Sequence, residues 1–369
     1  MIQPFKSLAL FLFLVSSSAS FAFTKAIDSI QLIKPSGPYS VGTVTYEWTD
    51  TTRTVKLNEG IIEKRRLIAQ IWYPSQNNTN GTLAPYSAVS KDYLEVMTNA
   101  FQRAGFNNSI STSHIILISP GRGTERYMYT TIAEELVSHG YTVVAVDMPK
   151  IGYTIYGDGY IIKPSITFKP PRGMMAGPYE KVDAFFEKPT KMGFEDLRFV
   201  LSKLKELNTD DPDNRFTNKL NLKAIGIFGH SLGGRIAGEF ANRTPAVKAY
   251  AAMEGIPPRK IRYKGMLDIP VMMLCSSGTW PYAKDNYFSL IDHRKKPVYM
   301  VELPRFNHNS VTDNPYIFPD IFKFEIDAVE ALKTTREILL GYFNGMLKED
   351  NTKLDALQEN ESIKLQVYP

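Results

Sequence analysis

The sequence lacks several features that would place it in a specialised class of protein. Cys275 is the only cysteine in 369 residues, so no disulfide can form within the chain and stability must come from a hydrophobic core. After the N-terminus, no apolar run approaches the roughly 20 residues of a membrane-spanning helix. No Lys/Arg block with interleaved aromatics is present, and the net charge of +5 is mild. We therefore expect a globular protein that does not bind nucleic acid.

The first 22 residues are typical of a signal peptide. Lys6 gives a short positive start, and an apolar segment of residues 8–15 follows it. Ser20 and Ala22 supply small residues at the −3 and −1 positions of a cleavage site. We expect export, to the periplasm or the medium, and a mature chain of residues 23–369 that forms a single domain.

Strand-like and helix-like segments alternate along most of the chain. Residues 43–48 and 66–73 predict an antiparallel strand pair, and residues 91–104 are compatible with a helix. After that pair, the pattern predicts strands at 114–118, 141–146, 225–228, 246–253, 271–275 and 298–301, and helices at 125–138, 195–207 and 326–347. Such alternation predicts a mostly parallel central sheet with helices on both faces.

Two regions depart from this alternation. Residues 151–193 are rich in Gly, Pro, Tyr and Phe without a clear period, which is typical of a lid or binding loop. The alternative is a loop that packs on the domain without touching substrate. Residues 348–369 are polar, and we expect a peripheral tail. The aromatic residues of the first region that could line an acyl pocket are Tyr153, Tyr156, Tyr160, Phe168, Tyr179, Phe185 and Phe186.

The most informative motif is Gly229-His-Ser-Leu-Gly233, a G-x-S-x-G pentapeptide. It lies between the predicted strand 225–228 and a helix-like segment, 235–241. In this context a serine occupies a strained turn with its hydroxyl exposed, and small neighbours let strand and helix approach closely. We predict that Ser231 is a catalytic nucleophile. The alternative is an ordinary serine N-cap.

A serine nucleophile needs a general base, and in such folds the acid and the histidine follow it in the chain. Of the five histidines, only His293 and His308 follow Ser231. His308 lies in a polar loop just after the predicted strand 298–301, which favours it as the base. His293 is surrounded by charged residues, which is typical of a solvated surface position.

Two carboxylates are candidates for the acid that orients the base. Glu254 ends the first strand after the serine helix, and Asp285 follows the next strand after a loop. Asp268 precedes that strand and belongs at the wrong end of the sheet. The residues alone leave Glu254 and Asp285 open.

The oxyanion of an acyl-transfer intermediate needs backbone donors. The N–H of Leu232 begins the helix after the nucleophile, and the N–H of Arg122 lies in a glycine-flanked loop, residues 119–124. We predict that these two amides form the oxyanion hole. This chemistry needs neither a metal ion nor an organic cofactor.

Several stretches together resemble the secreted platelet-activating-factor acetylhydrolases and their bacterial relatives, serine esterases of the α/β-hydrolase fold. They keep their order across most of the mature chain: Gly37-Pro-Tyr-Ser-Val-Gly-Thr43, Ile71-Trp-Tyr-Pro-Ser75, Ser119-Pro-Gly-Arg-Gly123, Leu136-Val-Ser-His-Gly-Tyr141, Gly229-His-Ser-Leu-Gly-Gly234, Ala252-Met-Glu-Gly255 and Asn307-His-Asn-Ser310. The Gly-Pro-Tyr-Ser-Val-Gly and Trp-Tyr-Pro-Ser stretches are the more distinctive ones.

The resemblance implies an α/β-hydrolase with Glu254 as the acid and His308 as the base. The family acid is usually Asp, and in the oxyanion loop Pro120 and Arg122 replace a histidine and an apolar residue. The implied activity is hydrolysis of short or oxidised acyl groups from phospholipids, with transient contact to a membrane surface. The alternatives are a small-ester, lactone or polyester hydrolase without lipid recognition, and a hydrolase-like binding protein that has lost its activity.

Overall fold

The computed structural model describes residues 29–56, 60–77, 81–86, 96–177, 179–264, 267–291 and 294–369. The predicted signal peptide and His293 lie outside these ranges. Twelve of the described strands form one sheet, in the order β1-β5-β2-β3-β7-β6-β10-β11-β12-β13-β14 with β4 beside β5. Their bounds are β1 Ile30–Gln31, β2 Ser40–Lys56, β3 Ile62–Ser75, β4 Leu83–Pro85, β5 Val96–Gln102, β6 Ser113–Ser119, β7 Thr142–Asp147, β10 Leu220–His230, β11 Val247–Met253, β12 Val271–Ser276, β13 Val298–Leu303 and β14 Lys364–Tyr368.

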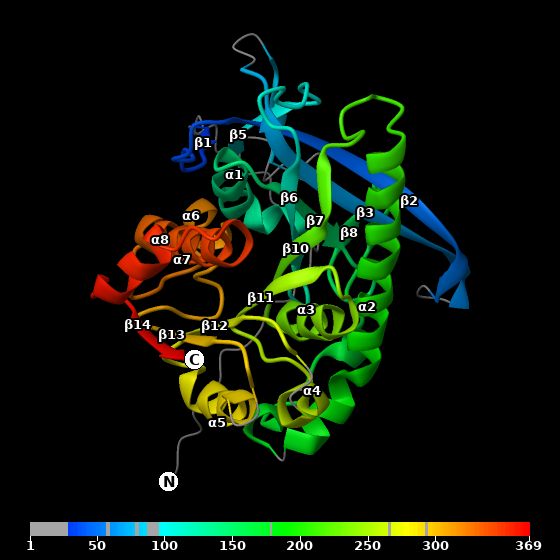
Figure 1. Cartoon of the computed structure of the whole chain (residues 1–369). Helices are drawn as coiled ribbons and strands as arrows, with labels where there is room; N and C mark the ends of the chain where they lie inside the picture. The colour runs from blue at the N-terminus through cyan, green and yellow to red at the C-terminus, as the bar shows by residue number, and fades with distance from the viewer. Residues whose placement is uncertain are drawn as a thin grey trace, which may run out of the picture.

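The middle of this sheet is parallel. Strands β7, β6, β10, β11, β12 and β13 all run in the same direction, each hydrogen-bonded to the next. Antiparallel pairs extend it on both sides, β3 beside β7 and β14 beside β13. Strand β10, which carries the G-x-S-x-G motif, lies between β6 and β11 near the centre of the sheet (Figure 1).

Helices cover both faces of the sheet because alternate residues of each buried strand point to opposite sides. In β6, Ile115 and Leu117 belong to the core under α2 and α3, whereas Ile116 and Ile118 belong to the core under α1 and α7. Figure 1 shows these two helix pairs on opposite sides of the sheet. The predicted fold class, α/β with a mostly parallel sheet, is confirmed. The helices are α1 Thr130–Ser138, α2 Tyr179–Thr209, α3 Leu232–Arg243, α4 Arg259–Lys264, α5 Trp280–Ile291, α6 Asn314–Ile317, α7 Ala328–Lys348 and α8 Thr352–Ala356, with short 3₁₀ turns η3 Arg126–Tyr129, η4 Ile166–Phe168, η5 Met174–Ala176 and η6 Leu357–Glu359.

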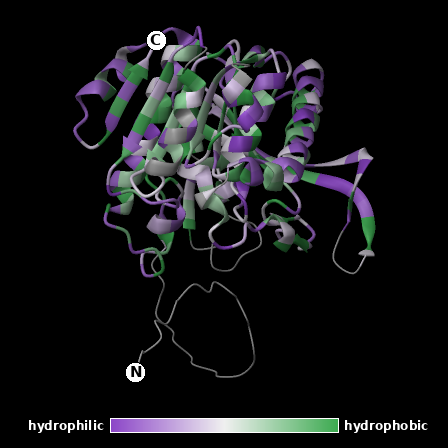
Figure 2. Cartoon of the chain, turned by 90° about the horizontal axis from the view of Figure 1, so that it is seen from below, coloured by the Kyte–Doolittle hydropathy of each residue, from purple (hydrophilic) through white to green (hydrophobic). Residues whose placement is uncertain are grey.

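The predicted antiparallel pair is present and longer than expected. Strand β2 pairs with β3 over most of their lengths, and the register shifts between Asp50 and Thr54. The end of this ribbon projects from the body of the molecule (Figure 2). Hydrophobic residues concentrate in the central strands in the same view. Among the described residues, no helix is both long enough and apolar enough to cross a bilayer.

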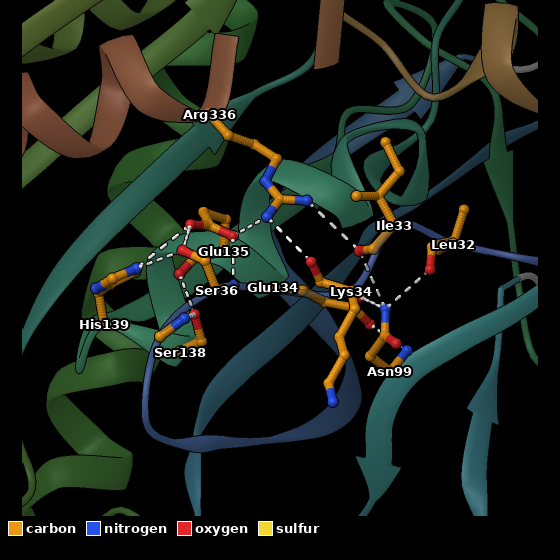
Figure 3. Close-up of polar contacts among 11 residues, drawn as sticks. Leu32, Ile33, Lys34, Ser36, Asn99, Glu134, Glu135, Ser138, His139 and Arg336 are labelled. Carbon is orange, nitrogen blue, oxygen red and sulfur yellow. Dashed lines mark hydrogen bonds and ion pairs between the residues drawn. The ribbon is translucent and has the colours of Figure 1, made fainter. Parts of the chain in front are cut away.

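The segment before β2 is fastened to the domain by a buried polar cluster (Figure 3). Glu135 of α1 accepts hydrogen bonds from the backbone N–H and the hydroxyl of Ser36, and it pairs with Arg336 of α7. The same guanidinium donates to the carbonyls of Ile33 and Lys34, at 3.5 and 3.2 Å. These contacts explain how a chain without disulfides orders its leading segment against two helices.

The expectation of a helix over residues 91–104 is wrong for the part that the structure describes. Residues 96–102 form strand β5, which lies between β1 and β2. Val96, Thr98 and Ala100 are buried while the residues between them are partly exposed, a period of two that fits a strand. Pairing with two neighbouring strands outweighs the weak local preference of this segment.

The irregular region predicted for residues 151–193 is only partly irregular. Strands β8 (Thr154–Ile155) and β9 (Ile161–Ile162) form a small hairpin, and from Tyr179 the chain is already helical as α2, a helix of 31 residues with Pro189 inside it. Its buried positions recur at helical spacing, including Val182, Gly193 and Leu197. The bulky aromatics at its start hid this period in the sequence.

The C-terminal residues 348–369, expected to be peripheral, complete one edge of the sheet. Strand β14 pairs antiparallel with β13, and Tyr299 lies opposite Val367. Leu354 and Leu357 are buried in the core beneath α7. The tail is therefore an integral part of the fold.

Candidate active site

Ser231 occupies the turn between β10 and α3, as the motif predicts. Its backbone angles are φ 56° and ψ −123°, a conformation that residues with a side chain rarely adopt. The Ser231 N–H donates to the carbonyl of Met253 on β11, at 2.8 Å. This bond to the neighbouring strand holds the strained turn in place, and strain of this kind is concentrated at functional sites.

The glycines of the motif are required by close backbone contacts. A Cβ at Gly229 would overlap the carbonyl oxygen of Gly233, and a Cβ at Gly233 would overlap that of Ser119 on β6. Strand, helix and the loop after β6 therefore meet at Ser231. This contact is the physical reason for the small residues on both sides of Ser231.

Glu254 follows β11 directly and is 7% exposed. Its backbone also has a positive φ, 54°. The carboxylate accepts hydrogen bonds from the Ser276 N–H, from the Ser276 hydroxyl at 3.1 Å and from the Thr279 hydroxyl at 2.9 Å. The remaining contact is to His308, with 3.3 Å between Glu254 Oε2 and His308 Nδ1. Glu254 is thus held rigidly against the His308 ring.

His308 lies in the loop after β13, at the carboxyl edge of the sheet. Because the Glu254 oxygen accepts the hydrogen bond, Nδ1 carries a proton and Nε2 is left to accept one. The His308 side chain is 45% exposed, so Nε2 is accessible. The loop is shaped by its own polar groups: Asn307 N–H donates to Ser310 Oγ at 3.0 Å, and Asn309 N–H donates to Asn307 Oδ1 at 2.9 Å.

His230, next to Ser231 in the chain, joins two parts of the structure through its ring. Its Nε2 lies 2.8 Å from the His308 carbonyl, and its Nδ1 lies 3.0 Å from the Tyr129 hydroxyl. A carbonyl only accepts, so Nε2 carries the proton and Nδ1 accepts from Tyr129. Complete burial lowers the pKa of His230 to about 3, which keeps the ring neutral. The Tyr129 oxygen in turn accepts from the Gly121 N–H, at 3.2 Å.

Replacing His230 with phenylalanine should therefore lower kcat more than it changes KM. Both ring hydrogen bonds are lost while the ring volume is kept, so the His308 loop is held less firmly. We expect a drop of roughly tenfold to hundredfold in kcat, because a buried hydrogen-bond partner left unpaired costs about 1–3 kcal/mol. Steady-state kinetics, with thermal unfolding as a check of folding, measures this. An unchanged kcat in the folded variant would contradict the positioning role.

The five residues singled out in the sequence line one cavity of about 560 Å³. They are Ser231, Glu254, His308, Arg122 and Leu232. Most of the remaining wall is apolar: Pro170, Met175, Val182, Phe186, Ile256, Cys275 and Ala283. Such a cavity, apolar with a few convergent polar groups, is typical of a small-molecule site.

Two backbone amides expected to donate to an oxyanion line this cavity, and neither has a hydrogen-bond partner among the described residues. They are the N–H groups of Arg122 and Leu232. The other amides of the loop are occupied: Gly123 N–H donates to Ile151 O at 3.0 Å, and Thr124 N–H to Gly121 O at 3.3 Å. The free amides therefore remain available to an oxyanion beside Ser231.

The residues that were rejected or left open as acid, base or nucleophile lie in different parts of the structure. Asp268 is exposed ahead of β12, at the opposite end of that strand from Glu254. Asp285 belongs to α5, and its side chain lies outside the described part of the structure, as does His293. Cys275 is buried, as expected for core packing, and it also contributes to the cavity wall.

Of the aromatic residues expected at an acyl pocket, only Phe186 is in the described cavity wall. Tyr156 and Phe168 are buried in the hydrophobic core clusters instead. Tyr153 and Tyr160 are exposed. The region 151–193 therefore supplies one wall of the cavity mainly through aliphatic side chains.

Comparison with known proteins agrees with this architecture. Residues 114–273 match the alpha/beta hydrolase fold family. The chain therefore has the α/β-hydrolase fold. Residues 24–149 match the family platelet-activating factor acetylhydrolase, isoform II, so the predicted resemblance is confirmed over that range.

Among solved structures, 710 chains match this protein. One is a ferulic acid esterase from Streptomyces cinnamoneus, with a TM-score of 0.73 and 23% sequence identity over 92% of this chain and 99% of that chain. At this identity the likeness shows the fold alone. Comparison with curated proteins finds no match.

The groups that hold Glu254 and His308 in place were not predicted from the sequence. Ser276 and Thr279 donate to Glu254, and His230 and Tyr129 link the oxyanion loop to the His308 loop. The turn after β12, Ser276-Ser-Gly-Thr279, offered a usable signal, because polar residues at the carboxyl end of a parallel strand lie beside the site. The role of His230 had no comparable signal.

A buried carboxylate anchors the far end of the His308 loop to α1. Asp313 Oδ2 accepts from the Thr131 N–H and the Tyr86 hydroxyl, both at 3.2 Å. Asp313 Oδ1 is buried without a partner among the described residues. Burial raises the pKa of Asp313 from 3.8 to about 7. The folded state therefore holds a proton that the unfolded chain releases, and stability falls as pH rises from about 4 to about 7.

Replacing Asp313 with asparagine, which cannot ionise, should reduce the loss of stability on raising the pH. We expect the fall in Tm between pH 5 and pH 8 to be smaller in Asp313→Asn than in the unmodified protein, by about a few degrees. Part of the fall should remain, because burial also raises the pKa of Glu125 to about 8 and that of Glu134 to about 7. The exposed Asp320→Asn is the control. An Asp313→Asn variant with the full original fall would contradict the assignment.

Proposed function

We propose that the protein is an exported serine esterase that hydrolyses carboxylic acyl esters, most readily short-chain or phospholipid-type esters. The observation that carries the proposal is the single cavity shared by Ser231, His308, Glu254 and the two free amides. Export is proposed from the signal-peptide pattern of residues 1–22. The match to the platelet-activating factor acetylhydrolase family supports the substrate class.

In the proposed reaction, Ser231 Oγ attacks the ester carbonyl carbon while its proton passes to His308 Nε2. Glu254 orients the ring and stabilises the imidazolium. The N–H groups of Arg122 and Leu232 donate to the carbonyl oxygen as it becomes negative. Collapse breaks the carbon–oxygen bond to the alcohol, which takes the proton from His308. Water then repeats these steps on the acyl-enzyme, releasing the acid and restoring Ser231.

The cavity suits a short acyl chain. Its volume of about 560 Å³ must hold both the acyl group and part of the alcohol. The side chains of Met175, Val182 and Phe186 close one side of it, and Ile256 lies on the wall as well. Removing a short apolar chain from water against these side chains favours binding by roughly 25 cal/mol per Å² buried.

Transient contact with a membrane surface is part of the proposal. The region 151–193 bounds the cavity and carries a group of exposed large apolar side chains. These are Tyr153, Tyr160, Ile161, Ile166 and Met175, with Ile166 76% exposed. Exposed apolar groups are typical of an interaction surface, and Met175, which lines the cavity, would bring lipid next to it.

The second candidate is a small-ester hydrolase without lipid recognition, which the fold likeness to a ferulic acid esterase favours. One substrate panel separates the two. It contains 4-nitrophenyl esters of increasing chain length, 2-acetyl and long-chain phospholipids as monomers and in vesicles, and methyl ferulate, with Ser231→Ala as the blank.

We expect the highest kcat/KM on short chains and Ser231-dependent release of acetate from the 2-acetyl phospholipid. Turnover of simple or aryl esters with none of the phospholipids would favour the second candidate. A folded protein that turns over no member of the panel would overturn both and favour a binding protein that has lost its activity.

A further inference from the structure

Arg122 brings an uncompensated positive charge into the cavity. Its side chain lines the cavity beside Ser231 and makes no hydrogen bond or ion pair among the described residues. The Arg122 side chain is partly buried, and this burial lowers the pKa of its guanidinium. A partly buried arginine is normally paired, because an isolated charge is costly to desolvate.

The other charged groups of the described cavity wall already have partners. Arg235 pairs with Asp183 and donates to the Thr190 hydroxyl at 3.1 Å. Glu254 is engaged with His308 and three further donors. Arg122 is therefore the charged group of the described cavity wall that a ligand would pair with.

The position of Arg122 determines where a ligand group bound to its guanidinium would lie. The loop touches the nucleophile: a Cβ at Gly121 would be 3.4 Å from Ser231 Cβ. Arg122 follows directly, and its backbone N–H is one of the free amides at the cavity. A group bound to its guanidinium thus lies within one arginine side chain of the ester carbonyl. A planar guanidinium binds the paired oxygens of a carboxylate or phosphate through two parallel hydrogen bonds.

We propose that Arg122 selects esters that carry an anionic group, a carboxylate or a phosphate, within one arginine side-chain length of the scissile carbonyl. This inference rests on the proposed esterase function and narrows its substrate class. The anionic partner pairs with the guanidinium in the cavity, and the apolar wall takes the uncharged part of the substrate.

Two matched substrate pairs test the inference on either side of the ester bond. On the acyl side, 4-nitrophenyl hydrogen adipate is compared with 4-nitrophenyl hexanoate. On the alcohol side, 4-acetoxybenzoate is compared with its methyl ester. Each variant is judged by its own ratio of kcat/KM for the anionic ester to kcat/KM for the neutral ester, because the Arg122 backbone belongs to the proposed oxyanion hole. Inorganic phosphate at constant ionic strength tests phosphate oxygens as a competitive inhibitor.

We expect Arg122→Met to lower this ratio by roughly tenfold to hundredfold in at least one pair, as for the loss of a hydrogen bond to a charged group. Arg122→Lys should give an intermediate ratio. Arg172→Met, at an exposed cation of the neighbouring region outside the described cavity wall, should leave it unchanged. Phosphate should inhibit the unmodified protein and lose potency on Arg122→Met.

A ratio in Arg122→Met equal to that of the unmodified protein, in both pairs, would overturn the inference. If the neutral esters are still hydrolysed in a Ser231-dependent manner, only the inference fails. If neither neutral nor anionic esters are hydrolysed by the unmodified protein, the proposed function fails with it.

Discussion

Replacing Ser231 with alanine is expected to lower kcat/KM on short-chain nitrophenyl esters by roughly 10⁴- to 10⁶-fold, to the background of the assay. Without the hydroxyl no acyl-enzyme can form, and the oxyanion donors alone leave only a small residual rate of ester hydrolysis. Alanine keeps a Cβ at the strained φ of 56°, so the turn and its bond to Met253 should be preserved. Binding of substrate should change little.

The matched control is Ser277→Ala. Ser277 follows β12 near the site, but its hydroxyl bonds to Glu302, at 3.1 Å, and it is not part of the described cavity wall. We expect it to retain nearly full activity. Substantial turnover by Ser231→Ala in a sample shown to be free of contaminating esterase would contradict the role of Ser231.

The second prediction with a large expected effect on activity concerns Glu254, the proposed acid. Glu254→Gln is expected to lower kcat by roughly 10²- to 10⁴-fold with the fold intact. The amide oxygen can still accept from Ser276, but an amide nitrogen facing His308 would donate to Nδ1 and leave the proton on Nε2. The ring would then be in the tautomer that cannot accept the serine proton.

Glu254→Ala should lose activity to a similar extent and also some stability. The Ser276 and Thr279 donors, now without their acceptor, cost about 1–3 kcal/mol each when left unpaired in a buried position. Asp285→Ala is the decisive comparison, because the residue types alone left it open as the acid. Collapse of activity in Asp285→Ala, with Glu254→Gln still active, would show that Asp285 is the acid.

Much of the fold was predictable because its buried strands carry strong local patterns. The apolar runs of β6, β7, β10, β11 and β12 identify a parallel sheet, since strands covered on both faces are apolar throughout. The segments that were predicted wrongly take their structure from pairing with neighbouring strands. Strand β5 is ordered by pairing with β1 and β2, and β14 by pairing with β13.

The candidate site likewise has parts that the sequence predicts and parts that depend on distant neighbours. Ser231 is predicted from a five-residue motif with its flanking strand and helix, and His308 from its place after a later strand. Glu254 is implied by the family resemblance, because the residues alone left Asp285 open as well. The hydrogen bonds that hold them join residues far apart in the sequence, such as Tyr129 with His230 and Thr279 with Glu254. No local pattern encodes such a contact. The charge of Arg122 was visible in the sequence, but its lack of a partner was not.

The central claim is that Ser231 is a nucleophile activated by His308 and Glu254. The most direct measurement is the intact mass of the mature protein after treatment with a fluorophosphonate, followed by peptide mapping. We predict a single adduct on Ser231, formed much more slowly in Glu254→Gln and absent in Ser231→Ala. A folded protein that gains no adduct, or gains it on another residue, would contradict the account.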